Sequence, residues 1–125
     1  MSEASNSLGR QGEILARDYL ARAGYTILEH NYRSRGGELD IIAEEGETLV
    51  FVEVKTRKDT AFGSPFEAVT TKKQRQMARV ALEYLVRQGG QERPARFDVV
   101  AVTFAGTTPR IELMRNAFGL EGDRR

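Results

Sequence analysis

Three charged side chains interrupt two apolar stretches that have the composition of buried strands. Asp40 lies in the run 39–42, and Glu53 and Lys55 lie in the run 49–55. An unpaired charge in a protein interior costs several kcal/mol. We therefore expect these three residues to have a chemical role that offsets the cost.

The spacing of these residues would bring their charges together. Residues two apart in a strand share a face, so Glu53 and Lys55 point the same way. If the four-residue connection 45–48 joins the two runs as a hairpin, Asp40 lies opposite Glu53, with Cβ atoms about 4.5–5.5 Å apart. Two carboxylates this close repel each other unless a cation lies between them. Mg²⁺ suits this position because it binds through one or two carboxylates, water and phosphate, and Mn²⁺ has similar preferences.

Lys55 then has a place in the chemistry. Its ammonium could orient an attacking water and stabilise negative charge on a phosphate. The pattern predicts hydrolysis of a phosphodiester, with Asp40 and Glu53 as metal ligands. Ordinary ion pairs among these residues and neighbouring arginines explain the same spacing equally well.

The elements that must position this hairpin alternate between helix and strand. Apolar spacing predicts helices over 8–24 and 70–88, the second capped by Thr70 or Thr71. Strands are expected over 25–28, 38–43, 49–55 and 97–102, with a short edge strand over 110–114. The central runs are apolar on both faces, which is typical of a sheet covered by helices on both sides. The crossover helix favours a parallel pair, so we expect an α/β sandwich with a mixed sheet of four or five strands.

Composition limits the class of protein. A chain of 125 residues is most simply one domain, with a core over about 9–118 and a frayed tail over 121–125. The absence of cysteine excludes disulfides, zinc–thiolate sites and a cysteine nucleophile, and it fits a reducing cytoplasm. The polar start has no signal-peptide core, and no run is long enough to span a membrane. We expect a cytoplasmic protein without membrane contact.

Positive charge is concentrated although the net charge is only +1. Residues 55–79 contain seven basic and two acidic side chains. Such a band can attract a polyanion, although a solvated helix face explains it as well. The candidate phosphate contacts flank the hairpin or begin the second helix: Arg33, Arg35, Arg57, Lys58, Lys72 and Lys73.

An ordered set of motifs resembles a known family. In chain order they are GRQGE, GGELDII, LVFVEVKTR, FGSPFEAV followed by TTKKQ, RFDVVAV and RNAF. This set, over residues 9–118, resembles the bacterial YraN family, which is similar to archaeal Holliday-junction resolvases. An acidic residue followed by E-x-K in the next strand is also similar to the PD-(D/E)xK nuclease superfamily, whose members share the restriction-endonuclease-like fold.

The resemblance implies roles for particular residues. It places metal ligands on Asp40 and Glu53 and the catalytic lysine on Lys55. It places a helix carboxylate on Glu13, which could reach the metal directly or through water, and a site-facing polar side chain on Gln74. Glu13 could instead only complement the helix dipole, and Gln74 could be a solvated helix residue.

The resulting expectation is a metal-dependent, nuclease-like protein with Mg²⁺ or Mn²⁺ as cofactor. It would bind nucleic acid and hydrolyse DNA phosphodiesters at branched or recombination intermediates, in DNA repair. The resemblance to resolvases, which work as dimers, implies a homodimer. Two alternatives remain open. One is a catalytically silent nucleic-acid-binding module, and the other is a phosphodiesterase acting on a small substrate.

Overall fold

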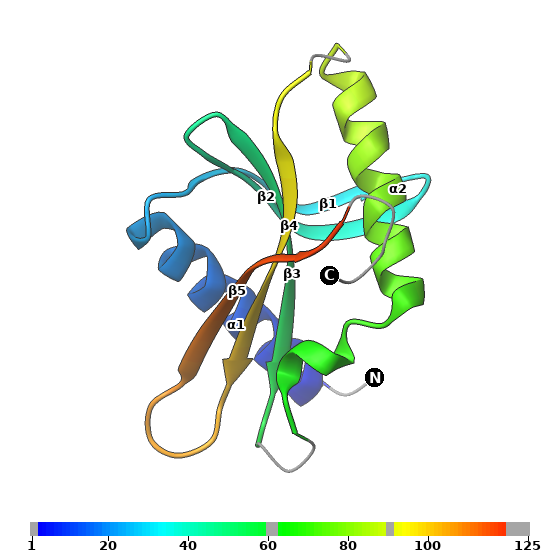
Figure 1. Cartoon of the computed structure of the whole chain (residues 1–125). Coiled ribbons are helices and arrows are strands. Elements are labelled where there is room, and N and C mark those ends of the chain that lie inside the picture. Colours follow the sequence, from blue (N-terminus) through cyan, green and yellow to red (C-terminus); the bar gives the residue numbers. More distant parts are fainter. Residues whose placement is uncertain (1–2, 60–62, 90–91, 120–125) are drawn as a thin grey trace.

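Five strands form one mixed sheet between two helices in the computed structural model, which describes residues 3–59, 63–89 and 92–119 (Figure 1). The strands lie in the sheet in chain order, and β3 and β4 are parallel while the other neighbours are antiparallel. The predicted α/β class and the predicted parallel pair are confirmed, and the arrangement is consistent with a restriction-endonuclease-like sandwich. In chain order the elements are α1 (Glu3–Arg22), β1 (Thr26–Ser34), β2 (Gly37–Glu45), β3 (Thr48–Arg57), the 3₁₀ helix η1 (Pro65–Ala68), α2 (Thr71–Arg87), β4 (Ala95–Thr103) and β5 (Arg110–Phe118).

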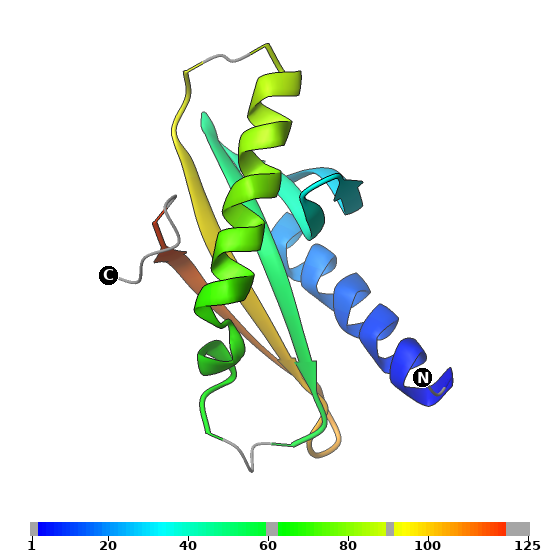
Figure 2. The same ribbon diagram turned by 90° about the vertical axis from the view of Figure 1, so that its right-hand side faces the viewer.

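The two long helices cover opposite faces of the sheet: they lie to either side of β3 and β4 in Figure 1, and α2 lies in front of these strands in Figure 2. Phe51 packs into the core under α2, whereas Val50 and Val52 pack into the core under α1. Successive residues of a strand point to opposite faces. This alternation explains why β3 is apolar at nearly every position.

Several element boundaries differ from those expected. β1 extends from Thr26 to Ser34, well beyond the expected strand over 25–28. α1 begins at Glu3, and β5 continues to Phe118. Polar sequence concealed the longer strands, because pairing with β2 and β4 satisfies their backbone groups whatever the side chains are. The expected tail 121–125 lies outside the described residues.

A buried carboxylate near the start of β4 joins this strand to the residue before β1 and to β5. Asp98 is fully buried and accepts hydrogen bonds from Tyr25 Oη at 2.7 Å, Arg96 Nε at 3.0 Å and the Asn116 backbone N at 2.9 Å. Burial, followed by the hydrogen bond to Asp98, raises the pKa of Tyr25 to about 12. These contacts give Asp98 a structural role.

No helix among the described residues is long and apolar enough to cross a membrane.

Candidate functional site

Strands β2 and β3 separate at Asp40. Their last backbone pair is Ile41 with Val52, and the same register continued by one step places Asp40 across from Glu53. Asp40 Oδ2 instead accepts a hydrogen bond from the backbone N of Val54 at 2.7 Å. Beyond this point β2 runs toward α2 while β3 continues along the sheet (Figure 1). The Asp40 carboxylate is therefore held at the fork between the two strands.

The backbone of β2 is irregular at this fork. Leu39 and Ile42 both pack into the core under α2, although residues three apart in a regular strand would face opposite sides. The neighbouring strand is irregular at the same level, because Asn31, which the register places across from Asp40, has a φ of 53°. Asparagine tolerates this left-handed conformation better than most residues. The charge of Asp40 accordingly raises the pKa of Glu53 in β3 and that of Glu13 in α1, on the opposite face of the sheet.

Glu53 is a nearly buried carboxylate beside Asp40. Its side chain belongs to a residue only 5% exposed, and burial is the main cause that raises its pKa to about 8. The negative charge of Asp40 and a hydrogen bond with it raise the pKa further, whereas Lys73 and Lys55 act in the opposite direction. Two neighbouring carboxylates that cannot both ionise easily are the arrangement that a cation would relieve.

Glu13 approaches the same charges from the other side of the sheet. Burial, and then the charge of Asp40, raise the pKa of Glu13, while Arg17 and a hydrogen bond with Asn31 lower it. Glu13 and Lys55 line a cavity of about 630 Å³ between α1, β3 and η1. Asp40 and Glu53 do not line it, so the cavity lies beside the carboxylate pair.

A glycine allows α1 to bring Glu13 this close. A Cβ on Gly12 would lie 2.1 Å from Thr56 Oγ1, which is far shorter than the non-bonded contacts that Cβ atoms make in proteins. α1 therefore contacts β3 closely only because residue 12 lacks a side chain. The GRQGE motif thus positions the glutamate that follows its second glycine.

Gln74 directly follows Lys73 on α2. Its side chain is 2% exposed, so the alternative of a solvated helix residue is wrong. Its Nε2 donates a hydrogen bond to the Val69 carbonyl oxygen at 3.0 Å, and it lines a small cavity with Val99 and Met114. Its Oε1 is buried and has no partner among the described residues. No hydrogen bond among the described residues joins Gln74 to Asp40 or Glu53, although Val99, which lines the same small cavity, pairs with Glu53 across β3 and β4.

Among the predicted phosphate-binding residues, two arginines already have partners within the fold, whereas two lysines are exposed to solvent. Arg57 is engaged within the fold, because it donates hydrogen bonds to Thr103 Oγ1 at 3.2 Å and to the Gly63 carbonyl oxygen at 2.6 Å. Arg33 pairs with Glu38 at 3.3 Å on the surface. Lys58 and Lys72 are exposed.

Two residues near the carboxylates were not anticipated in their observed roles. Lys73, expected to contact phosphate, extends from α2 to Glu53, with 3.6 Å between Nζ and Oε2. Asn31 forms a hydrogen bond with Glu13. The sequence gives no local signal for either contact, because both join segments distant along the chain.

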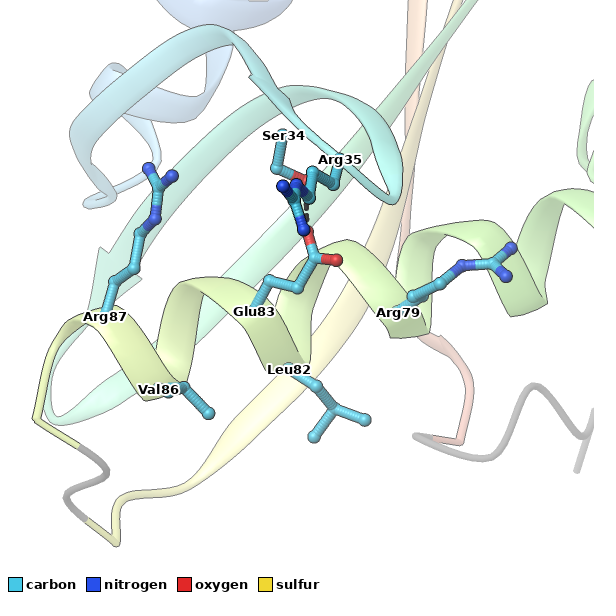
Figure 3. A pocket seen from close by; sticks show the side chains of 7 residues that line it. All are labelled: Ser34, Arg35, Arg79, Leu82, Glu83, Val86 and Arg87. Carbon is cyan, nitrogen blue, oxygen red and sulfur yellow. Dashed lines mark hydrogen bonds between the residues drawn. The ribbon is translucent and has the colours of Figure 1, made fainter.

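Arg35 lies in a groove between the β1–β2 turn and α2 (Figure 3). The groove has a volume of about 470 Å³, and Arg79 and Arg87 also line it, together with the exposed apolar side chains of Leu82 and Val86. A second cavity, of about 320 Å³, shares Arg79 with this groove and is also lined by Lys72 and Lys73. We call the residues Lys72, Lys73, Arg79 and Arg35 the basic track. This track leads from the Lys73 ammonium, which contacts Glu53, along α2.

Comparison with known proteins identifies relatives over nearly the whole chain. Residues 12–102 match the model of a family described as "Uncharacterised protein family UPF0102". A UPF0102 protein of Geobacter metallireducens is 52% identical over 120 residues, covering 96% of this chain and 98% of the relative. A second, from Geobacter sulfurreducens, is 51% identical over 95% of this chain and 94% of the relative. A third, from Rhodococcus jostii, is 51% identical over 90% and 96%.

Proposed function

The chain belongs to the uncharacterised family UPF0102, as its motifs suggested, and we propose from its site that it is a metal-dependent nuclease that hydrolyses DNA phosphodiester bonds. The observation that carries this proposal is the pairing of Asp40 with the nearly buried Glu53 at the fork between β2 and β3, with Lys55 on the same strand. A purely structural role gives little reason to place two carboxylates side by side away from water.

The donor set fits a hard divalent cation with an open coordination shell. Carboxylate oxygens suit Mg²⁺ or Mn²⁺, and Mg²⁺ usually takes one or two of them and completes its shell with water and phosphate. Asp40 and Glu53 would hold the ion, and Glu13 would act through water from the other side. No group of three or more histidine, aspartate or glutamate side chains in the described parts of the chain is placed to hold a metal ion, so the direct ligands here would be the two carboxylates alone. An open site of two carboxylates is the kind that leaves room for a substrate phosphate.

The protein side chains then have separate tasks. A bound divalent ion would make a coordinated water more acidic and polarise the phosphate. Asp40 is oriented in advance by the Val54 N–H, so little reorganisation is needed when a ligand arrives. Lys55 lines the cavity beside the pair and would stabilise negative charge on the phosphate. Burial and the charge of Asp40 raise the pKa of Glu13, which lines the cavity together with Lys55 and would accept a proton from water there.

The basic track supplies a path for the rest of the substrate. Lysine and arginine contacts to phosphates position a nucleic acid without reading its sequence. Their arrangement along α2 suits an extended polyanion better than a small phosphoester. This favours a polymeric substrate, and DNA is the form that we propose.

The decisive experiment is a cleavage panel of linear, nicked, flapped and four-way DNA together with RNA, each with Mg²⁺ and with Mn²⁺. The wild type should cut at least one DNA, and Asp40→Asn and Lys55→Met should reduce cleavage by about 10²-fold or more while still binding DNA. Glu67→Gln is the matched control, because Glu67 lines the same cavity from η1 but is exposed.

Other results would point elsewhere. DNA binding without cleavage under any condition would favour the silent binding module. Hydrolysis of bis(p-nitrophenyl) phosphate without affinity for nucleic acid would favour the small-substrate enzyme. Full activity of Asp40→Asn would remove the carboxylate pair from the mechanism.

The path along α2 has its own test in the salt dependence of DNA binding. Arg79→Gln and Arg35→Gln should each reduce the slope of log affinity against log salt by about 1, because each removes about one phosphate contact. Arg22→Gln is the control, since Arg22 ends α1 on the opposite face of the sheet and pairs with Asp18. Equal slopes for all three variants would exclude the track as the binding surface.

A further inference from the structure

Lys73 makes an unusual contact for a residue at the start of a helix. It lies in the first turn of α2, where its backbone N–H donates a hydrogen bond to the capping Thr70 Oγ1 at 3.2 Å. Its ammonium crosses to Glu53 Oε2 at 3.6 Å. Lys72, the preceding residue, is exposed. The two neighbouring lysines therefore differ in what they contact.

The local field does not favour lysines at this position. The amino end of a helix carries partial positive charge and stabilises anions, so cations there are unfavourable. The first turn of α2 contains Lys72 and Lys73 and no acidic residue. An anion must compensate for Lys73, and Glu53 is the carboxylate that does so.

The groups facing Glu53 come from three elements. β2 contributes the Asp40 carboxylate, β3 contributes Lys55, and α2 contributes Lys73. Within the described residues, Lys73 makes the one ion pair shorter than 4 Å with Glu53. In the protein without metal, it is therefore the closest cation to the carboxylate pair.

Lys73 also has a second anion site within reach. Together with Lys72 and Arg79 it lines the cavity of about 320 Å³ that begins the basic track. Its contact with Glu53 is longer than a good charged hydrogen bond, which measures about 2.7–2.9 Å. A lysine has a flexible stem and rotatable donors, so it can exchange one anion for another at low cost.

We infer that Lys73 is a displaceable internal cation that couples metal binding to nucleic-acid binding. Without metal it is the cation that faces Glu53 and offsets its charge whenever that carboxyl is ionised. A divalent ion held by Asp40 and Glu53 takes over that task, and the released ammonium then binds a phosphate of the substrate in the adjoining cavity. This inference rests on the proposed metal site and adds the regulation of that site.

The coupling has two measurable consequences. Lys73 competes with the metal for Glu53, so removing it should tighten metal binding. When metal binds, the released Lys73 ammonium gains a contact with a nucleic-acid phosphate. Removing Lys73 should therefore abolish the increase in DNA affinity that metal produces. Coupling between two ligands is reciprocal, and its usual size is about 5–150-fold in affinity.

The test compares Lys73→Met with Lys72→Met, which removes the same charge from the same helical turn. Mn²⁺ binding is measured by calorimetry, and the affinity for four-way DNA is measured with and without Mn²⁺ in variants that also carry Lys55→Met to suppress cleavage. Lys73→Met should bind Mn²⁺ at least about fivefold more tightly than Lys72→Met, and its DNA affinity should no longer respond to Mn²⁺.

A second readout needs neither DNA nor turnover. In EDTA at pH 9, where Glu53 is ionised, Lys73→Met should unfold at a lower urea concentration than Lys72→Met, because Glu53 loses its ion-pair partner. Saturating Mn²⁺ should remove that difference.

The outcomes separate this inference from the proposed function. If the wild type binds Mn²⁺ and cleaves DNA but the two lysine variants have equal Mn²⁺ affinity, the displaceable cation is excluded and the nuclease proposal stands. If the wild type binds no Mn²⁺, with or without DNA, both proposals fail.

Discussion

Replacing Glu53 with glutamine should remove a pH-dependent penalty on folding. The carboxyl has an ordinary pKa of 4.5 and a pKa of about 8 in the folded protein. Below pH 4.5 it is protonated in both states and costs nothing. Between these values the unfolded chain ionises while the folded protein keeps the proton, so stability declines as pH rises. Glutamine has nearly the same shape and no such proton equilibrium.

The size of the effect follows from the two pKa values. Each pH unit between 4.5 and about 8 reduces the free energy of unfolding by about 1.4 kcal/mol. The penalty reaches about 5 kcal/mol above pH 8, and at pH 7 it is about 3 kcal/mol. Because Glu53 is nearly buried, solvent screening reduces these figures little. We therefore expect Glu53→Gln to match the wild type near pH 4.5 and to be more stable by several kcal/mol at pH 8.

The assay is urea unfolding of both proteins from pH 5 to 9 in EDTA, since a divalent ion would favour the ionised carboxyl. Glu67→Gln serves as the control, because the same change at an exposed glutamate should leave the pH profile of the wild type unaltered. A difference between Glu53→Gln and the wild type that stays constant across this range would refute the assignment of Glu53 as a destabilised, buried acid.

Three further predictions concern the framework of the site and use urea unfolding at one pH. Asp98→Ala should cost about 2–4 kcal/mol, because the buried Tyr25 hydroxyl and the Asn116 backbone N lose their acceptor, while the partly buried Arg96 is left with the Glu45 carboxylate; a loss under 1 kcal/mol on the same scale would show that this cluster contributes little. Gly12→Ala should destabilise by about 1–3 kcal/mol through the clash with Thr56. Gly9→Ala, in the same helix with open space around it, should instead be neutral or stabilise by up to about 1 kcal/mol, and the same sign for both glycines would contradict the close approach of α1. Thr70→Ala should cost about 1 kcal/mol as the loss of a helix cap, and an unchanged midpoint would exclude that role.

The hairpin at the centre of the site was predictable because its determinants are local. Strict period-two spacing assigns Glu53 and Lys55 to one face, and a tight turn at Gly46 fixes the register that places Asp40 across from Glu53. The parallel pairing of β3 and β4 follows similarly, since a helix of α2's length lies between them. Regular geometry over short distances is encoded by nearby residues.

The rest of the site depends on contacts that no local pattern specifies. Asn31 adopts a left-handed conformation inside a strand, and this irregularity lies beside Asp40. Gln74 is buried and bonded to the Val69 carbonyl oxygen, because the orientation of α2 on the sheet turns that side chain toward the core. Periodicity predicts that α2 has an apolar face, but it does not predict which polar side chains lie at the edge of that face.

The sequence alone determined the order of the elements, the alternation that fills both cores, and the residue types able to hold a cation. Only the tertiary structure decided that Lys73 contacts Glu53 and that Glu13 approaches Asp40 from the opposite face of the sheet. The physical reason is that strand pairing and helix periodicity arise within a few residues of chain. The position of one charge relative to another across a sheet is set instead by how whole elements pack.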